Sequence, residues 1–129
     1  MSLRFQPKAK SVVVCDFHGY IVPEMIKKRP VVVLAHNRRN SKLVTIVPLS
    51  TTQPTFVEEH HCKLSKNPLP GEPEDEVVWA KCDMIATVSL ERLDRYRVSR
   101  RQYVIPVVSD DDFKAIKVGV RKALQLDTD

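Results

Sequence analysis

The chain has 129 residues, of which 43% are hydrophobic, enough for one hydrophobic core and too few for two comfortable ones. Its longest apolar runs have five and four residues, which excludes a membrane-spanning segment, and no secretory signal pattern is present near the N-terminus. We therefore expect one domain over residues 1–129, soluble and cytoplasmic, with no membrane association.

The net charge of +5 is distributed unevenly along the chain. Residues 1–50 carry nine Lys and Arg against two Asp and Glu, a balance of +7, whereas residues 51–129 carry twelve against fourteen, a balance of −2. A cationic half suggests a polyanionic ligand, and nucleic acid is the commonest one. Lys and Arg also keep proteins soluble, so the charge alone does not decide the ligand.

Six apolar segments of strand length, rich in Val, Ile and aromatic residues, predict a mainly β protein. They span residues 11–17, 29–35, 43–49, 56–64, 76–84 and 102–108. The polar stretch HNRRNSK predicts a hairpin connection between the second and third segments. The stretch SKNPLPGEPEDE predicts a long acidic loop exposed to solvent.

Helical signals are confined to the second half of the chain. In TVSLERLDRY, Ser89 is positioned to cap a short helix. In SDDDFKAIKVGVRKALQLD, Ser109 can cap a longer helix and Asp112 completes a capping box. An apolar stripe at helical spacing follows, formed by Phe113, Ile116, Val120 and Leu124. We expect a small, curved antiparallel sheet or barrel with a short helix and a C-terminal amphipathic helix packed on it.

Strand alternation locates candidate chemistry near residue 80. In VVWAKCDM, Trp79, Lys81 and Asp83 share one predicted face, and the residues between them point to the core. A cation and a carboxylate at this spacing are also common on any solvated sheet. The predicted polar face therefore needs support from neighbouring segments.

That support comes from the ends of two other predicted strands. Ser50, Thr51 and Thr52 follow the strand VTIVPL, and Arg29 begins the strand PVVVLA. Hydroxyls and backbone amides at a strand end bind phosphate oxygens, and arginine grips them with a planar fork. These groups are the parts of a phosphodiester site, although STT by itself also suits an ordinary polar turn.

Together, KKRPVVVLA, LVTIVPLSTTQP and VVWAKCDMIATVSLERL resemble three signature blocks of the MazF/PemK (Kid) toxin family in order and spacing. The resemblance implies an SH3-like antiparallel barrel of the MazF/PemK/CcdB kind and a homodimer. It also implies an endoribonuclease that inhibits growth by cutting single-stranded RNA at short sequences, as mRNA interferases do. A cognate antitoxin would neutralise it, and the toxin–antitoxin complex would bind DNA.

The resemblance also implies site residues. Arg29 matches the catalytic arginine of the family's Arg-Pro pair, and Ser50 matches the Ser or Thr that holds the scissile phosphate. Asp83 and Glu24 match two family acids, and both remain candidates for the general base. RNA-binding roles are expected for a second set of residues: Lys27, Lys28, Thr51, Thr52, Trp79 and Lys81.

Two positions depart from the family pattern. Some members carry an arginine two residues before the third-block acid, where this chain has Lys81, which cannot form the same bidentate contact. Other members carry a histidine before the loop acid, where this chain has Pro23. His18 lies nearby, but its position does not match, and we interpret it as a loop residue. The Lys81 replacement is the best sequence argument for a non-catalytic binding module, and a gyrase-directed toxin is a third alternative.

The family mechanism needs no metal or other cofactor, because a ribose 2′-hydroxyl attacks the adjacent phosphorus and leaves a 2′,3′-cyclic phosphate and a 5′-hydroxyl. Arg29 and Lys81 would stabilise the negative charge of the transition state.

The histidines and cysteine of HHC, with Cys82, match no standard zinc spacing. The three cysteines lack CxxC spacing and fit a reducing compartment rather than a disulfide framework.

Overall fold

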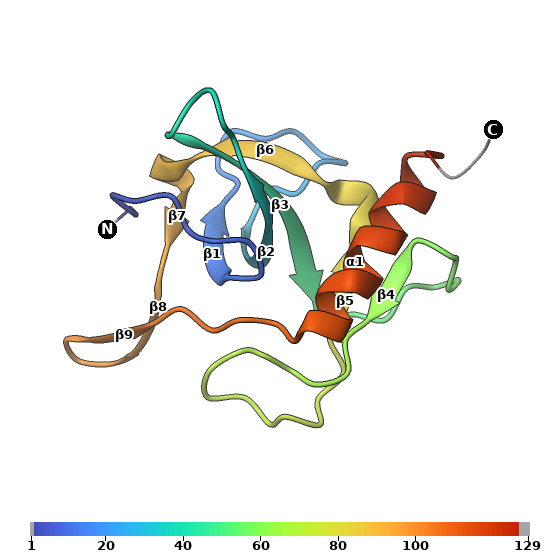
Figure 1. The fold of residues 1–129 in the computed structure, drawn as a ribbon. Coiled ribbons are helices and arrows are strands. Elements are labelled where there is room, and N and C mark those ends of the chain that lie inside the picture. The colour runs from blue at the N-terminus through green and yellow to red at the C-terminus, as the bar shows by residue number, and fades with distance from the viewer. Residues whose placement is uncertain (1, 127–129) are drawn as a thin grey trace.

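The structure is a computed structural model that describes residues 2–126. Seven strands form an antiparallel sheet in the order β4-β5-β3-β2-β1-β7, and β6 also pairs with β3 (Figure 1). The sheet strands are β1 (Val12–Asp16), β2 (Lys28–His36), β3 (Leu43–Ser50), β4 (His61–Lys63), β5 (Trp79–Lys81), β6 (Ala86–Ser89) and β7 (Leu93–Asp94). The other elements are a hairpin of β8 (Tyr96–Ser99) and β9 (Gln102–Val104), the 3-10 turns η1 (Cys82–Met84) and η2 (Leu90–Arg92), and α1 (Asp110–Ala123).

The three longest strands form the centre of the sheet because each contains a run of β-branched residues. In β1 and β2, Val12 pairs with Val32 and Val13 with Val31, and all four side chains are fully buried. The HNRRNSK stretch forms the predicted connection between β2 and β3. There the Asn37 side-chain oxygen accepts hydrogen bonds from two backbone amides at 2.9 Å, which closes the turn.

Strand alternation divides the core between the two faces of the sheet. Val12, Val32, Val47 and Leu49 pack on one face with Ile116 and the rest of the buried side of α1. The intervening residues of β1–β3 pack on the other face, which is covered by the N-terminal segment and the β1–β2 loop. The two faces therefore have different surroundings, and α1 lies against one of them (Figure 1).

The C-terminal helix α1 has some of the features that the sequence predicted for it. Ser109 Oγ accepts a hydrogen bond from the Asp112 amide at 3.1 Å, as an N-cap should. The Asp112 carboxylate does not complete a capping box. It accepts hydrogen bonds from the Ser65 amide and hydroxyl at 2.9–3.1 Å, which fixes the loop after β4 to the helix start. Leu124 of the predicted stripe lies beyond the end of α1 and is 47% exposed.

Several strand predictions were too long, and three strands, β6, β7 and β8, were missed. The predicted strands at 56–64, 76–84 and 102–108 shorten to the three-residue strands β4, β5 and β9. The stretch before Ser89 forms β6 along β3, and the capped helix is only the 3-10 turn η2, with Ser89 Oγ accepting from the Glu91 amide. The sheet is not a closed barrel, so the SH3-like barrel expectation is not confirmed.

Gly119 allows α1 to approach η1 closely. A Cβ atom added at this position would lie 2.7 Å from Cys82 Sγ and 3.0 Å from the His60 carbonyl oxygen. Alanine favours a helix interior over glycine by about 1 kcal/mol, but overpacking costs about 1–3 kcal/mol. We expect Gly119→Ala to lower the free energy of unfolding by about 1 kcal/mol or more, measured by urea denaturation with circular dichroism.

The control for this prediction is the double variant Gly119→Ala/Cys82→Ala, which removes the sulfur atom that the new methyl group meets. It should lose less stability than the sum of the two single variants, because the new Cβ occupies the vacated space. Stability of Gly119→Ala equal to or above that of the wild type would contradict the close packing.

Candidate functional site

The paired strands β2 and β3 separate at one end of the sheet. Their last register pair is Val31 with Pro48, although β2 begins three residues earlier, at Lys28, and β3 continues to Ser50. Pro30 and Pro48 lack the amide hydrogen that a ladder needs at this point. Beyond it, β2 pairs only with β1 and the end of β3 pairs with β5.

A pocket of about 340 Å³ opens where these strands separate. It includes residues from both faces of the sheet and is closed by the loop after β4 and by the start of β8. Its lining residues are Val14, Lys28, Arg29, Pro30, Leu49, Ser50, Thr51, Leu69, Glu72 and Tyr96. The pocket thus brings together four residues that the sequence predicted as a site: Lys28, Arg29, Ser50 and Thr51.

Arg29 is held by its strand and has no charged partner. Its backbone lies opposite Cys15, whose side chain is fully buried, so the position is fixed by the core. The side chain is partly buried, and within residues 2–126 no carboxylate forms an ion pair with it. Its Nε atom is buried without a hydrogen-bond acceptor. A buried donor left in this state costs about 1–3 kcal/mol.

Ser50 lies one strand away from Arg29. The Ser50 hydroxyl oxygen accepts a hydrogen bond from the Thr52 amide at 3.1 Å, which orients it while leaving its hydrogen free to donate. Thr51 follows at the pocket rim, and Thr52 is exposed next to it. These hydroxyls and the Arg29 guanidinium can bind the oxygens of one phosphate group.

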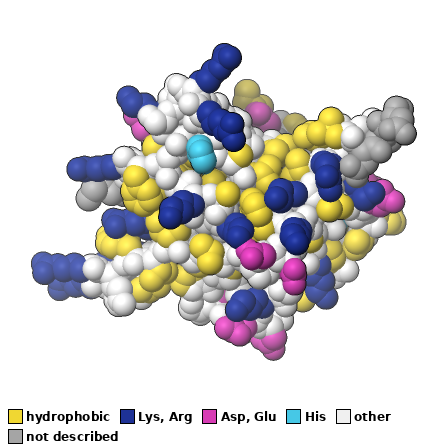
Figure 2. Space-filling model, viewed as in Figure 1, with side chains coloured by type: hydrophobic (Ala, Val, Ile, Leu, Met, Phe, Trp, Pro, Cys, Tyr) yellow, Lys and Arg dark blue, Asp and Glu magenta, His cyan; other side chains and the backbone are white. Residues whose placement is uncertain are grey.

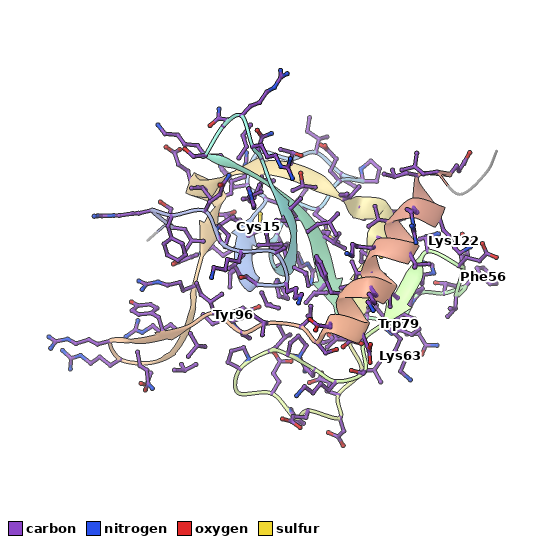
Figure 3. The ribbon with its side chains drawn as sticks, in the orientation of Figure 1. Cys15, Phe56, Lys63, Trp79, Tyr96 and Lys122 are labelled. Atoms are coloured by element: carbon purple, nitrogen blue, oxygen red, sulfur yellow. The ribbon has the colours of Figure 1, made fainter. Side chains whose placement is uncertain are left out.

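The face that carries Arg29 and Ser50 continues onto β5 and β4, on the side of the sheet away from α1. Trp79 lies opposite Ser50, and Lys63 lies opposite Trp79 on the next strand (Figure 3). Trp79 is only 7% exposed, and its indole Nε1 is buried without an acceptor. The predicted face is therefore correct for Trp79 and Lys81, but Trp79 is covered rather than displayed to solvent.

The two acids expected as general-base candidates lie outside the pocket. Glu24 is exposed in the β1–β2 loop, where its carboxylate accepts a hydrogen bond from the Ile21 amide at 2.7 Å. Asp83 belongs to η1, because β5 ends at Lys81 and strand alternation stops there. Its carboxylate lies 3.7 Å from His60 Nε2, and His60 Nδ1 lies 3.6 Å from Glu58. The prediction that Asp83 shares the strand face of Trp79 was wrong.

The lysines divide between the pocket and other surfaces. Lys28 lines the pocket, whereas Lys27 is exposed just before β2. Lys81 is partly buried on β5 and lies opposite His61 of β4. Lys28 is thus the lysine placed to reach a ligand in the pocket.

Six pocket residues were not predicted as site residues: Val14, Pro30, Leu49, Leu69, Glu72 and Tyr96. The acidic stretch that contains Glu72 was predicted to be a solvated loop, and residues 71–77 are exposed and lie outside any helix or strand. In the structure, buried Asn67 organises this loop, since its side-chain oxygen accepts from the Leu69 amide at 2.8 Å and its side-chain nitrogen donates to Glu72 at 3.4 Å. Gly71 allows the turn between them through a φ of +79°. No strand or helix periodicity marks such a loop.

The cysteines and histidines do not form a metal centre in the described part of the chain, where no group of three or more His, Cys, Asp or Glu side chains is placed to hold a metal ion. The three cysteines are free and buried. Burial raises the pKa of Cys62 to about 11, with a smaller contribution from Asp112, and burial likewise raises the pKa of Cys82 to about 12. These thiols are therefore protonated and unreactive at neutral pH.

Comparisons with known proteins agree on one family. A family model described as "PemK-like, MazF-like toxin of type II toxin-antitoxin system" matches residues 8–124. The uncharacterized protein YifN of Escherichia coli (strain K12) is 32% identical over 120 residues, which cover 78% of this chain and 80% of that protein.

Solved structures share the fold. A MazF structure from Deinococcus radiodurans superposes with a TM-score of 0.69 at 14% identity, covering 94% of this chain and 98% of that one. An endoribonuclease from a mycobacterial species gives 0.64 at 20% identity and covers 96% of both chains. A mycobacterial endoribonuclease in complex with its cognate antitoxin gives 0.63 at 23% identity, with 93% and 96% coverage. At these identities the likeness shows the fold.

The absence of an acceptor for Arg29 predicts an unusual effect on stability. We expect Arg29→Met to raise the free energy of unfolding by about 1 kcal/mol, because it removes a partly buried cation with an unsatisfied donor. The matched control is Arg92→Met. Arg92 donates to the carbonyl oxygens of Asp16 and His18 at 3.0 and 2.7 Å and lies over the Tyr20 ring, so its removal should destabilise the protein by about 1–3 kcal/mol.

Thermal and urea denaturation of the two variants would measure this difference. Equal destabilisation by both substitutions would show that Arg29 has a structural partner in solution, and the assignment of Arg29 as an anion receiver would then fail.

Proposed function

Because the chain belongs to the PemK-like, MazF-like toxin family of type II toxin–antitoxin systems, we propose that it is a sequence-specific endoribonuclease toxin. Its substrate is single-stranded RNA, and its products carry 2′,3′-cyclic phosphate and 5′-hydroxyl ends. A cognate antitoxin neutralises it, and the active form is a homodimer.

One observation carries this proposal: an arginine that has no carboxylate partner among residues 2–126 lines an open pocket together with two hydroxyl side chains. A structural arginine is normally paired or hydrogen-bonded, as Arg92 is. Arg29 instead has a buried, unsatisfied Nε, and Ser50 and Thr51 line the same pocket. A phosphodiester supplies the acceptors that this group of donors lacks.

The reaction uses the RNA's own nucleophile. The ribose 2′-oxygen attacks the adjacent phosphorus as its proton leaves, the bond from phosphorus to the 5′-oxygen breaks, and that oxygen takes up a proton. Negative charge accumulates on the phosphoryl oxygens in the transition state, and Arg29, Ser50 and Thr51 stabilise it with fixed donors. Glu24 and Asp83 remain the proposed alternatives for the general base, and Lys81, Trp79, Thr52 and Lys27 are proposed to contact RNA further from the scissile bond.

Surface features support partner binding. A groove of about 610 Å³ lies between α1 and β2 and combines apolar and cationic side chains: Leu34, Ala35, Lys114, Lys117, Val118, Val120 and Arg121. The face drawn in Figure 2 shows Lys and Arg side chains interspersed with hydrophobic ones over this region. Such a surface suits an acidic, partly apolar antitoxin segment or a second subunit.

Among the described residues, no helix has the length and apolar character needed to cross a membrane.

Removal of Arg29 should reduce catalysis far more than RNA binding. By analogy with the loss of one preorganised oxyanion donor, we expect Arg29→Ala to lower the single-turnover cleavage rate about 100- to 1,000-fold at saturating RNA. Arg39→Ala, in the exposed turn between β2 and β3, is the matched control and should cut at nearly the wild-type rate. Folded Arg29→Ala that cleaves within threefold of wild type would exclude Arg29 from catalysis.

Cleavage should not require a divalent cation, because the nucleophile and the charge-stabilising groups are present without one. We expect purified protein with excess EDTA to cut mixed-sequence RNA and to leave ends that accept 5′-phosphorylation directly and 3′-ligation only after cyclic-phosphate removal. Loss of cleavage in EDTA that Mg²⁺ restores would contradict this mechanism.

Binding of intact RNA would favour the non-catalytic module, and inhibition of DNA supercoiling without RNA cleavage would favour the gyrase-directed toxin.

A further inference from the structure

The pocket at the strand separation is lined by two chemically different sets of residues. Lys28, Arg29, Ser50 and Thr51 supply cations and hydroxyls, which suit a phosphate. Val14, Pro30, Leu49 and Leu69 supply apolar walls, together with the ring of Tyr96. A volume of about 340 Å³ lies within the usual range of small-ligand sites and is large enough for one nucleotide unit.

The pocket lining also includes one carboxylate, from Glu72, an exposed residue of the loop after β4. The Asn67 side chain donates to Glu72 Oε1 at 3.4 Å, and Asn67 is itself 4% exposed and hydrogen-bonded within the same loop. Glu72 is therefore held by a buried group, while its second carboxylate oxygen has no hydrogen-bond donor among residues 2–126. Carboxylates in RNA-binding sites accept hydrogen bonds from base edges.

Tyr96, at the start of β8, also lines the pocket (Figure 3). Burial raises the pKa of its phenol, and the negative charge of nearby Glu72 raises it further. The phenol is thus neutral at physiological pH and keeps its hydrogen as a donor. The pocket accordingly presents an acceptor at Glu72 and donors at Tyr96 and Lys28.

We propose that this pocket binds the base of a nucleotide next to the scissile phosphate and selects guanine. Guanine alone among the four RNA bases has two adjacent donors, N1–H and the N2 amino group, on its Watson–Crick edge. These can bind the Glu72 carboxylate while the neighbouring O6 accepts from Lys28 or Tyr96. Adenine and cytosine each have a single amino group there, and uracil has one N–H between two acceptors.

This inference rests on the proposed function, since a base pocket beside Arg29 and Ser50 requires that the substrate is RNA. An arginine or aromatic side chain of a protein partner would also suit apolar walls with a carboxylate. RNA is favoured because Lys28, Arg29 and the two hydroxyls lie in the same pocket, where they repel a cationic side chain and attract a phosphate.

The first experiment measures binding of the four nucleoside 3′-monophosphates by titration calorimetry, which requires no catalysis. Wild type should bind guanosine 3′-monophosphate at least tenfold more tightly than the other three, as expected for a bidentate contact to a base. Glu72→Gln should lose this preference, because the amide has only one acceptor. Glu74→Gln, an exposed residue two positions along the same loop and outside the pocket lining, is the matched control and should keep it.

The second experiment maps cleavage sites in a mixed-sequence RNA pool. Wild type and Glu74→Gln should cut with guanine enriched at one position beside the scissile bond, and Glu72→Gln should reduce that enrichment about tenfold while still cutting RNA. A uniform loss of cleavage at all sequences in Glu72→Gln would assign the carboxylate to the reaction itself and overturn the base-pocket proposal.

Failure of this proposal can be distinguished from failure of the proposed function. Equal or absent binding of the four nucleotides by a protein that cuts RNA would overturn the guanine pocket alone. Guanine-selective, Glu72-dependent binding by a protein that cuts no RNA would support the pocket and overturn the ribonuclease activity. Capture of an arginine-containing antitoxin peptide that depends on Glu72, without nucleotide binding, would assign the pocket to a protein partner.

Discussion

The separation of β2 and β3 beyond Val31 and Pro48 determines where this molecule can bind a ligand. Paired along their full length, these strands would form a continuous sheet at the place where the pocket now opens. Two prolines remove ladder donors at the point of separation, and the valine-rich parts of both strands anchor them on the other side of it. The opening is thus an edge of a rigid core, and the side chains around it have little freedom to move away.

Much of the central sheet could be predicted from the sequence because its signals are local. The valine runs define β1, β2 and β3, and at each of the two caps a serine hydroxyl oxygen, of Ser89 or Ser109, accepts one hydrogen bond from a backbone amide. The bounds of β4 and β5 and the existence of β6 could not be predicted, because these short strands owe their conformation to pairing with partners distant in sequence. Whether the sheet closes into a barrel likewise depends on which strands pair with one another, and the residue pattern within one strand does not determine this.

The site divides in the same way. Arg29, Ser50 and Thr51 could be predicted because each lies at the end of a strongly predicted strand. Glu72 and Tyr96 could not, since one belongs to a loop shaped by buried Asn67 and the other to a hairpin strand that reaches the pocket only in the folded chain. The alternation of side chains along the strand predicted the correct face for Trp79 but not its burial. Alternation shows only which side of a strand a residue is on, and does not show which other strands and loops cover that side.

Two arginines differ in the partners that the fold gives them. Arg92 donates to two backbone carbonyls and lies 5.0 Å from the centroid of the Tyr20 ring, so its charge holds the β1–β2 loop in place. Arg29 has no ion-pair partner within residues 2–126 and retains an unsatisfied donor, a cost of about 1–3 kcal/mol against a typical domain stability of about 5–15 kcal/mol. Such a cost persists only where the surrounding core offsets it, and the buried valines on either side of the sheet provide that core. An internal carboxylate would remove the cost by pairing with Arg29, but it would then compete with a phosphate for the same donors. An Arg29 that remains unpaired is therefore the arrangement expected of a site that stabilises an external anion.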